Sequence, residues 1–157
     1  MKKFLISLLI GMLLLILGAT TLVTRSLSPY KQARAETIEL AEDRADLVTA
    51  DEFYWFNGDE TFFTITGKNS EGTPIVVIVQ QDGGAVQSYN QADTISEREA
   101  IIETYNREDP VKVLEARIGI YKEQPVWEVS FRQENDRIGY MILSLTSGEW
   151  IRTIKNI

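Results

Sequence analysis

Residues 52–63 read EFYWFNGDETFF, and this stretch decides what kind of fold the chain can adopt. The dipeptide Asn57-Gly58 tolerates positive φ at both positions and joins two runs of strand-forming residues, so the stretch predicts an antiparallel hairpin. It also holds six of the chain's fifteen aromatic residues. Because a strand has two faces and one core covers only one of them, the aromatic side chains need a second explanation.

Two helices and further strands are predicted around this hairpin. Ser28-Pro29 predicts the start of a helix from about residue 29 to 47, because serine caps free N–H groups and proline suits the first helical position. The run SERE at 96–99 is a capping box and predicts a second helix, with Ile101, Ile102 and Tyr105 on its buried face. Strands are predicted at 52–56, 61–66, 74–81, 85–89, 113–121, 125–132, 138–145 and 149–154.

The order of one helix and four strands occurs twice, at an offset of 64 residues. At this offset Phe63 falls on Trp127 and Val79 falls on Leu143, and residue classes match without a gap along the two halves. A chain of 157 residues has room for two very small units. We therefore expect an α+β fold of two tandem units, 26–92 and 93–157, each with a helix packed on an antiparallel sheet.

The repeat also predicts which aromatic side chains point away from the core. Tyr54 and Phe56 fall on Ile118 and Ile120, which are natural core residues. Strand alternation then turns three other side chains outward, and these form a predicted partner-binding surface: Phe53, Trp55 and Phe62. The sequence leaves three alternatives for what covers that surface: the sheet of the other unit, an external protein, or a peptide or glycan.

The N-terminal stretch predicts a membrane anchor, assigned to residues 1–25. Residues 4–23 read FLISLLIGMLLLILGATTLV without a charge, which is long enough to span a bilayer core and longer than a usual signal-peptide apolar region. Lys2 and Lys3 precede the span, and Arg25 alone follows it closely. This asymmetry predicts a single-pass protein of the cell membrane with a cytoplasmic N-terminus and an extracytoplasmic body.

Composition excludes several classes of function. The formal net charge is −7, and without Lys2, Lys3 and Arg25 the chain has 13 basic and 23 acidic residues, so nucleic acid is not an expected partner. The absence of cysteine and histidine removes disulfides, thiolate metal sites and the commonest general base.

Short motifs give no support for an enzyme. Ser28-Pro-Tyr-Lys31 matches the S-x-x-K pattern of serine β-lactamases and penicillin-binding proteins, but the accompanying S-D-N and K-T-G elements are absent and helix capping explains the serine. No calcium-loop or phosphate-loop spacing occurs. We therefore predict a non-enzymatic protein without catalytic, cofactor-binding or metal-binding residues and without a small-molecule substrate.

Two long runs resemble a known family. ETFFTITGKNSEGTPIVVIV and PVWEVSFRQENDRIGYMILSLTSGEW, together with the lysine-led anchor and the Ser-Pro helix start, resemble the TseB (YpmB) family of Gram-positive bacteria. The second run is also similar to a PepSY-type repeat. The resemblance implies a cystatin-like fold for each unit and an extracytoplasmic position on the cell membrane. It also implies a role in cell-wall elongation through association with a membrane-bound penicillin-binding transpeptidase.

The sequence leaves two functional hypotheses from different classes. In the first, an anchored, non-enzymatic adaptor binds a wall-synthesis transpeptidase beside it in the membrane. In the alternative, the body inhibits an extracytoplasmic peptidase, as PepSY-type and cystatin-like modules do, by inserting the loop at 67–73 or at 132–137 into a cleft.

Overall fold

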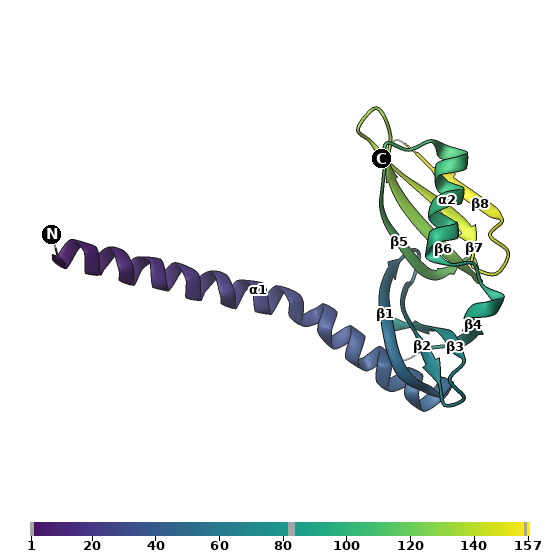
Figure 1. Cartoon of the computed structure of the whole chain (residues 1–157), viewed down its shortest axis with the longest axis horizontal. Helices are drawn as coiled ribbons and strands as arrows, with labels where there is room; N and C mark the ends of the chain where they lie inside the picture. The colour runs from purple at the N-terminus through teal and green to yellow at the C-terminus, as the bar shows by residue number, and fades with distance from the viewer. Residues whose placement is uncertain (1, 82–83, 156) are drawn as a thin grey trace. The chain divides into compact units, whose positions relative to one another are not determined.

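The computed structural model describes the backbone of residues 2–81, 84–155 and 157, and the side chains of 11–18, 29–81, 84–155 and 157. Two long helices and eight strands account for most of this part of the chain (Figure 1). In chain order the elements are α1 (Lys2–Ala45), β1 (Leu47–Asn57), β2 (Thr61–Asn69), β3 (Pro74–Gln80), β4 (Val86–Asn90), the 3₁₀ turn η2 (Gln91–Asp93), α2 (Glu97–Glu108), β5 (Lys112–Tyr121), β6 (Gln124–Arg132), β7 (Ile138–Ser144) and β8 (Trp150–Ile154).

The chain divides into two compact units, 1–35 and 36–157. The first consists of helix α1 as far as Ala35. Pro29 lies inside α1, so the predicted helix start at Ser28 is wrong. Proline lacks an N–H and removes one helical hydrogen bond, which a helix of this length tolerates. Among the residues whose side chains are described, no helix is long and apolar enough to cross a membrane. Much of the predicted span at 4–23 lies outside those residues.

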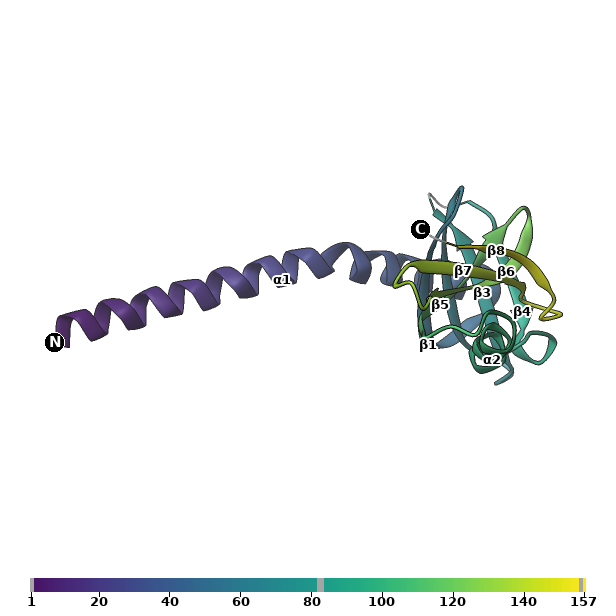
Figure 2. The same cartoon turned by 90° about the horizontal axis from the view of Figure 1, so that it is seen from above.

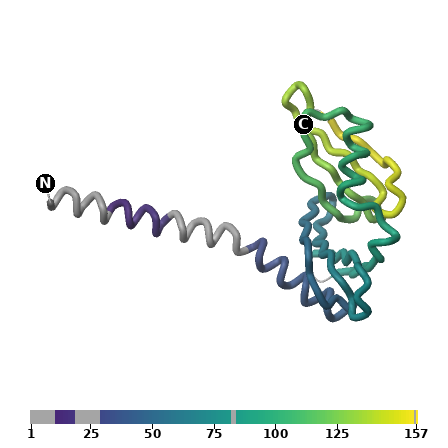
Figure 3. Tube along the Cα trace, viewed as in Figure 1, coloured from purple at the N-terminus to yellow at the C-terminus, as the bar shows by residue number. Residues whose placement is uncertain are grey.

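The second unit contains two four-stranded antiparallel sheets. Sheet A has the order β1-β2-β3-β4, and sheet B has the order β5-β6-β7-β8. The offset of 64 holds in their pairing, because Phe63 lies opposite Val79 in sheet A and Trp127 lies opposite Leu143 in sheet B. Each sheet takes up a continuous stretch of the chain, blue to teal and then green to yellow in Figure 3. The α+β class is therefore confirmed.

Helix α2 packs on one face of sheet B, and in Figure 2 it lies to one side of strands β6 to β8. Its predicted capping box is present, since Ser96 and Glu99 bond each other's backbone N–H groups. The predicted buried face is wrong at two of its three positions, because Ile102 and Tyr105 are 47% and 42% exposed, whereas Ile101 packs against the core. The buried positions are Ala100 and Thr104, whose small side chains let the helix approach the sheet closely.

The two sheets share one hydrophobic core, in which the edge strand β5 lies against one face of sheet A. The hydroxyl of Thr64 donates a hydrogen bond of 2.9 Å to the main-chain oxygen of Ile118. The ring of Phe56 lies where a side chain at Gly119 would otherwise project. A single cluster includes buried residues of both sheets, so one face of sheet A is buried against sheet B. The boundary predicted near residue 92 therefore stays a prediction.

Candidate functional site

The two faces of sheet A have different neighbours. Cross-strand partners share a face, so Trp55 lies on the same face as its partner Phe63, and Phe53 on the same face as Ile65. We call this the helix face and assign it to the end of α1 at residues 36–45, where Thr37 and Ala41 are buried (1% and 0% exposed). The opposite face meets sheet B, and we call it the junction face: Tyr54, Phe56, Phe62, Thr64, Thr66, Val76 and Ile78.

The structure contradicts the orientation predicted for Phe53, Trp55 and Phe62. Phe53 is 9% exposed and stacks on Phe63, with ring centroids 6.0 Å apart. Phe62 is 6% exposed and belongs to the junction face, beside Phe56. Trp55 is half-buried against Phe63 and donates from Nε1 to the side chain of Asn57. The three side chains are not on one face, so they do not form one outward surface.

The reason for this error is the length of one turn. The first hairpin closes between Asn57 and Thr61 and encloses three residues, whereas the second closes between Tyr121 and Gln124 and encloses two. The extra residue shifts residues 53–57 of β1 by one position against β2, which reverses the face of these side chains, and the register changes again between Ala50 and Phe53. The structural equivalent of the core residue Ile118 is therefore Trp55, not Tyr54.

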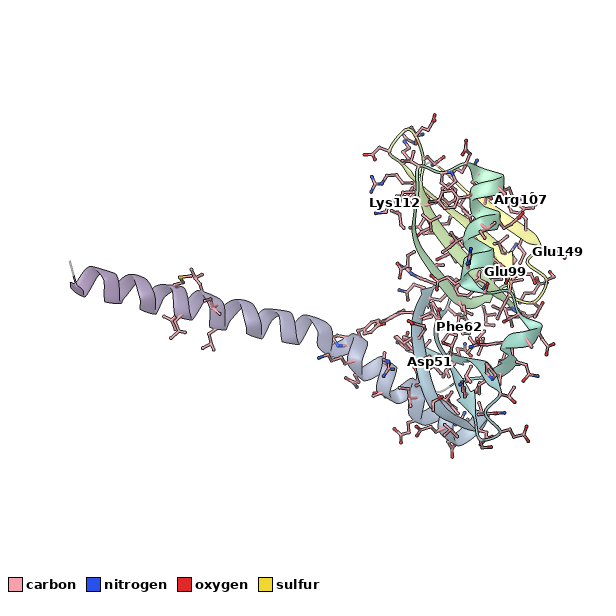
Figure 4. The ribbon with its side chains drawn as sticks, viewed as in Figure 1. Asp51, Phe62, Glu99, Arg107, Lys112 and Glu149 are labelled. Carbon is pink, nitrogen blue, oxygen red and sulfur yellow. The ribbon has the colours of Figure 1, made fainter. Side chains whose placement is uncertain are left out.

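A cleft with a volume of about 470 Å³ lies beside strand β5. We call it the junction cleft. One wall is the junction face of sheet A, and the other is the start of α2 with the segment that leads to it. Figure 4 labels Asp51 from the first wall and Glu99 from the second. The lining residues are Asp51, Glu52, Tyr54, Thr66, Val76, Gln91, Thr94, Ile95, Ser96, Glu97, Glu99, Ile118 and Trp127.

Two aromatic side chains, one from each half, meet in the junction cleft. Tyr54 and Trp127 make an edge-to-face contact with ring centroids 5.4 Å apart. The indole N–H of Trp127 donates to the main-chain oxygen of Ile95, which fixes its ring. The hydroxyl of Tyr54 donates to Glu97 at 3.3 Å. Burial, followed by the charges of Glu97 and Glu52, raises the pKa of Tyr54, so this phenol stays a neutral hydrogen-bond donor.

The rim of the junction cleft is acidic. Asp51, Glu52, Glu97 and Glu99 are among its lining residues, and no lysine or arginine is among those described there. Glu99 is engaged in the capping box, where N–H and O–H donation by Ser96 lowers its pKa. The cleft therefore presents negative potential beside two aromatic rings, which suits a cationic or amide-bearing segment better than an anion.

Metal sites need a set of donor side chains grouped together. Among the described residues, no three or more histidine, cysteine, aspartate or glutamate side chains are grouped so that they could hold a metal ion. The S-x-x-K serine, Ser28, has its side chain outside the described residues. Sequence reasoning missed the junction cleft, because nothing local to either half indicates that Tyr54 and Trp127 meet.

The geometry defines an α+β protein in which two antiparallel four-stranded sheets pack together. Residues 36–80 match the family model described as "Cell wall elongation regulator TseB-like domain". The chain therefore contains a TseB-like domain, and the resemblance found in the sequence is confirmed. The matched family is described as a regulator and not as an enzyme.

A similar solved structure supports the fold. The YpmB protein from Bacillus subtilis is similar with a TM-score of 0.69 and 23% identity, over 80% of this chain and 96% of that chain. A candidate lipoprotein from Clostridium difficile 630 has a TM-score of 0.42 and 7% identity, over 74% and 87% of the two chains. No curated protein matches the chain at a significant level.

Proposed function

We propose that this protein is a membrane-anchored, extracytoplasmic and non-enzymatic regulator of cell-wall elongation that acts by binding a membrane-bound penicillin-binding transpeptidase. The observation that carries the proposal is the match of residues 36–80 to a domain of cell-wall elongation regulators. The charge-free run at 4–23, with two lysines before it, supports the anchor and its orientation.

The junction cleft is the surface that we assign to the partner, in place of Phe53, Trp55 and Phe62. The segment matched by the family model supplies one wall, including Asp51, Tyr54 and Val76. We expect a basic segment of the transpeptidase to bind there, because the lining described for the cleft has four carboxylates and no cation. Tethering of both proteins to one membrane raises their effective concentration, so a weak contact is sufficient.

A site-specific crosslink tests this assignment. A photo-crosslinking residue at position 97 lies in the junction cleft, whereas one at position 134 lies in the exposed β6–β7 loop and serves as the control. Both full-length variants are reconstituted in vesicles with a full-length penicillin-binding transpeptidase. We expect an adduct from position 97 and little from position 134. Adducts from position 134 alone would move the contact elsewhere, and the lack of any adduct would remove the proposed partner.

The peptidase-inhibitor alternative places the contact in two loops, and both are closed by their own hydrogen bonds. The side chain of Asn69 accepts from the backbone N–H groups of Glu71 and Thr73. In the other loop Arg132 pairs with Asp136. Substitutions in the junction cleft should leave these loops unchanged. Shortening the loops therefore distinguishes the two hypotheses, because an inhibitor would lose its activity, whereas the proposed regulator would keep its adduct from position 97.

A further inference from the structure

A second groove lies on the other side of β5, with a volume of about 440 Å³. Its floor is the face of sheet B opposite α2, where Arg117, Glu128, Ile142 and Arg152 lie in one row across four strands. Its far wall is the turn of the first hairpin at 57–59. We call it the β5 groove. It differs from the junction cleft because arginine and lysine side chains line it.

Two of the cations in the β5 groove have no carboxylate partner among the described residues. Arg117 forms an ion pair with Glu115, so its charge is neutralised locally. By contrast, within the part of the chain that the structure describes, neither Lys122 nor Arg152 has a carboxylate oxygen within 4.0 Å. An otherwise acidic chain of net charge −7 thus keeps two uncompensated cations at one end of a groove.

Both unpaired cations converge on one phenol. Arg152 donates from Nη1 to the hydroxyl of Tyr121 at 2.8 Å. The ammonium of Lys122 lies 5.4 Å from the centroid of the same ring. The bond from Arg152 is the main reason why the pKa of Tyr121 is lowered. Two side-chain carboxylates also line the groove. Asp59 lies on the opposite wall, and burial raises the pKa of Glu128, which favours its neutral form.

The turn that carries Lys122 has an unfavourable sequence for its conformation. Lys122 and Glu123 have φ values of 49° and 63°, both in the left-handed region, and they form the two-residue loop between β5 and β6. Such loops favour Asn-Gly, because residues with larger side chains adopt positive φ at a cost. Backbone strain of this kind tends to occur at functional sites. In this turn the lysine ammonium lies beside the ring of Tyr121.

We propose that Tyr121, Lys122 and Arg152 form a carboxylate-binding site and that the β5 groove receives an extended acidic segment of a protein partner. A guanidinium and an ammonium side by side offer charge-assisted donors to a carboxylate. The half-buried side chains of Tyr140 and Ile154 also line the groove and supply apolar contact, which suits a peptide better than a bare phosphate. This inference rests on the proposed function in one respect, namely that the partner is a protein.

Binding is measured on the full-length chain in detergent micelles by NMR, with a synthetic peptide, acetyl-Ser-Glu-Ser-Glu-Ser-Glu-amide, as the probe. We expect saturable shifts at the Arg152 side chain and along 117–122, and none with the glutamine counterpart of the peptide. Arg152→Gln is expected to weaken binding about tenfold or more. Lys112→Gln is the matched control, because it removes a cation from the other end of β5 (Figure 4) and should leave binding unchanged.

Lys122→Asn separates binding from folding. Asparagine favours the left-handed region, so this variant is expected to unfold at a higher temperature than the wild type while it loses peptide binding. The proposal is overturned if the glutamate peptide gives no saturable shift, if Lys112→Gln weakens binding as much as Arg152→Gln, or if inorganic polyphosphate binds in place of the peptide. Because Lys122→Asn leaves the junction cleft intact, its crosslink from position 97 reports separately on the proposed function.

Discussion

At the scale of single residues, the contact between Phe56 and Gly119 joins the two sheets. Phe56 is 1% exposed, and its ring occupies the space beside β5 that any side chain at Gly119 would need. In sheet B this glycine lies opposite Val126, within the pairing and two residues before the hairpin end of β5. Glycine weakens a strand interior unless another group approaches closely, so its position here is explained by the aromatic ring.

Gly119→Ala is therefore expected to destabilise the protein by about 1–3 kcal/mol, because the added methyl group overlaps the Phe56 ring. Urea denaturation followed by tryptophan fluorescence measures the free energy of unfolding. Phe56→Ala removes Cγ and Cδ1, the two atoms nearest the added methyl group, so the double variant should lose less stability than the two single variants together. Additive losses would show that the ring and the glycine are not coupled.

The partly buried carboxylate of Glu128 destabilises the folded state at neutral pH. Burial raises its pKa above the ordinary value of 4.5, although Arg117 opposes the shift. The folded state thus holds the proton more tightly than the unfolded state, so this contribution to stability is present below pH 4.5 and is lost as the pH rises through the folded pKa.

Glu128→Gln should consequently raise the free energy of unfolding at pH 7 and leave it unchanged at a pH below 4.5. Denaturant unfolding at both pH values measures the difference. Glu134→Gln, at an exposed position of the β6–β7 loop, serves as the control for loss of one negative charge. A destabilised Glu128→Gln at pH 7 would mean that its attraction to Arg117 outweighs its desolvation.

At the scale of elements, helix α2 depends on its first turn. The hydroxyl of Ser96 accepts from the backbone N–H of Glu99, and the Glu99 carboxylate accepts from the backbone N–H of Ser96. Ser96→Ala is expected to cost about 0.5–2 kcal/mol, since one N–H at the helix start loses its partner. Thermal unfolding measures the loss, and Ser88→Ala, on the edge strand β4, is the control.

The capping box also makes stability depend on acid pH. Hydrogen bonds from Ser96 lower the pKa of Glu99 below 4.5, so its contribution is present above pH 4.5 and is lost as the pH falls through the folded pKa. Glu99→Gln should lack this dependence. The gap in stability between wild type and Glu99→Gln is expected to close at acid pH, and a gap that stays constant would contradict the role of the charge.

Most elements could be predicted from sequence, because each rests on local signals. The capping box at 96–99 and the strand order follow from capping chemistry and periodicity. The first hairpin forms as predicted, but its loop has three residues and neither Asn57 nor Gly58 has the positive φ on which the prediction rested. The face of β1 could not be taken from the repeat, since one additional residue in a turn reverses it. The repeat also fails at Gly67, which corresponds to Phe131. A side chain there would overlap the main-chain oxygen of Thr49, next to an irregularity in the β1–β2 pairing.

At the scale of the whole molecule, the shared core makes the two sheets of unit 36–157 interdependent. Phe56, Phe62 and Val76 of sheet A belong to the same buried cluster as Ile118 and Trp127 of sheet B. Separation of the halves would expose the junction face of sheet A. Small units that cannot bury such a face are not stable alone.

We therefore expect one cooperative unfolding transition for residues 36–157, with coincident midpoints for both sheets. Single-tryptophan variants that retain Trp55 or Trp127 report on sheets A and B, respectively. A shortened chain ending at residue 92 is expected to remain largely unfolded by circular dichroism. Two separate transitions, or a folded shortened chain, would show that the repeat units are independent domains.

The sequence by itself determined the class of fold, the number and order of strands, the second helix and the resemblance to TseB-like domains. These depend on hydrogen bonding and side-chain alternation within a few residues of each other. Only the tertiary structure decided which face of β1 meets which neighbour, and therefore that Phe53 and Phe62 are buried while Tyr54 lines a cleft with Trp127. Such contacts join residues far apart in the chain, and their geometry depends on the length of a turn and on the space that a glycine leaves.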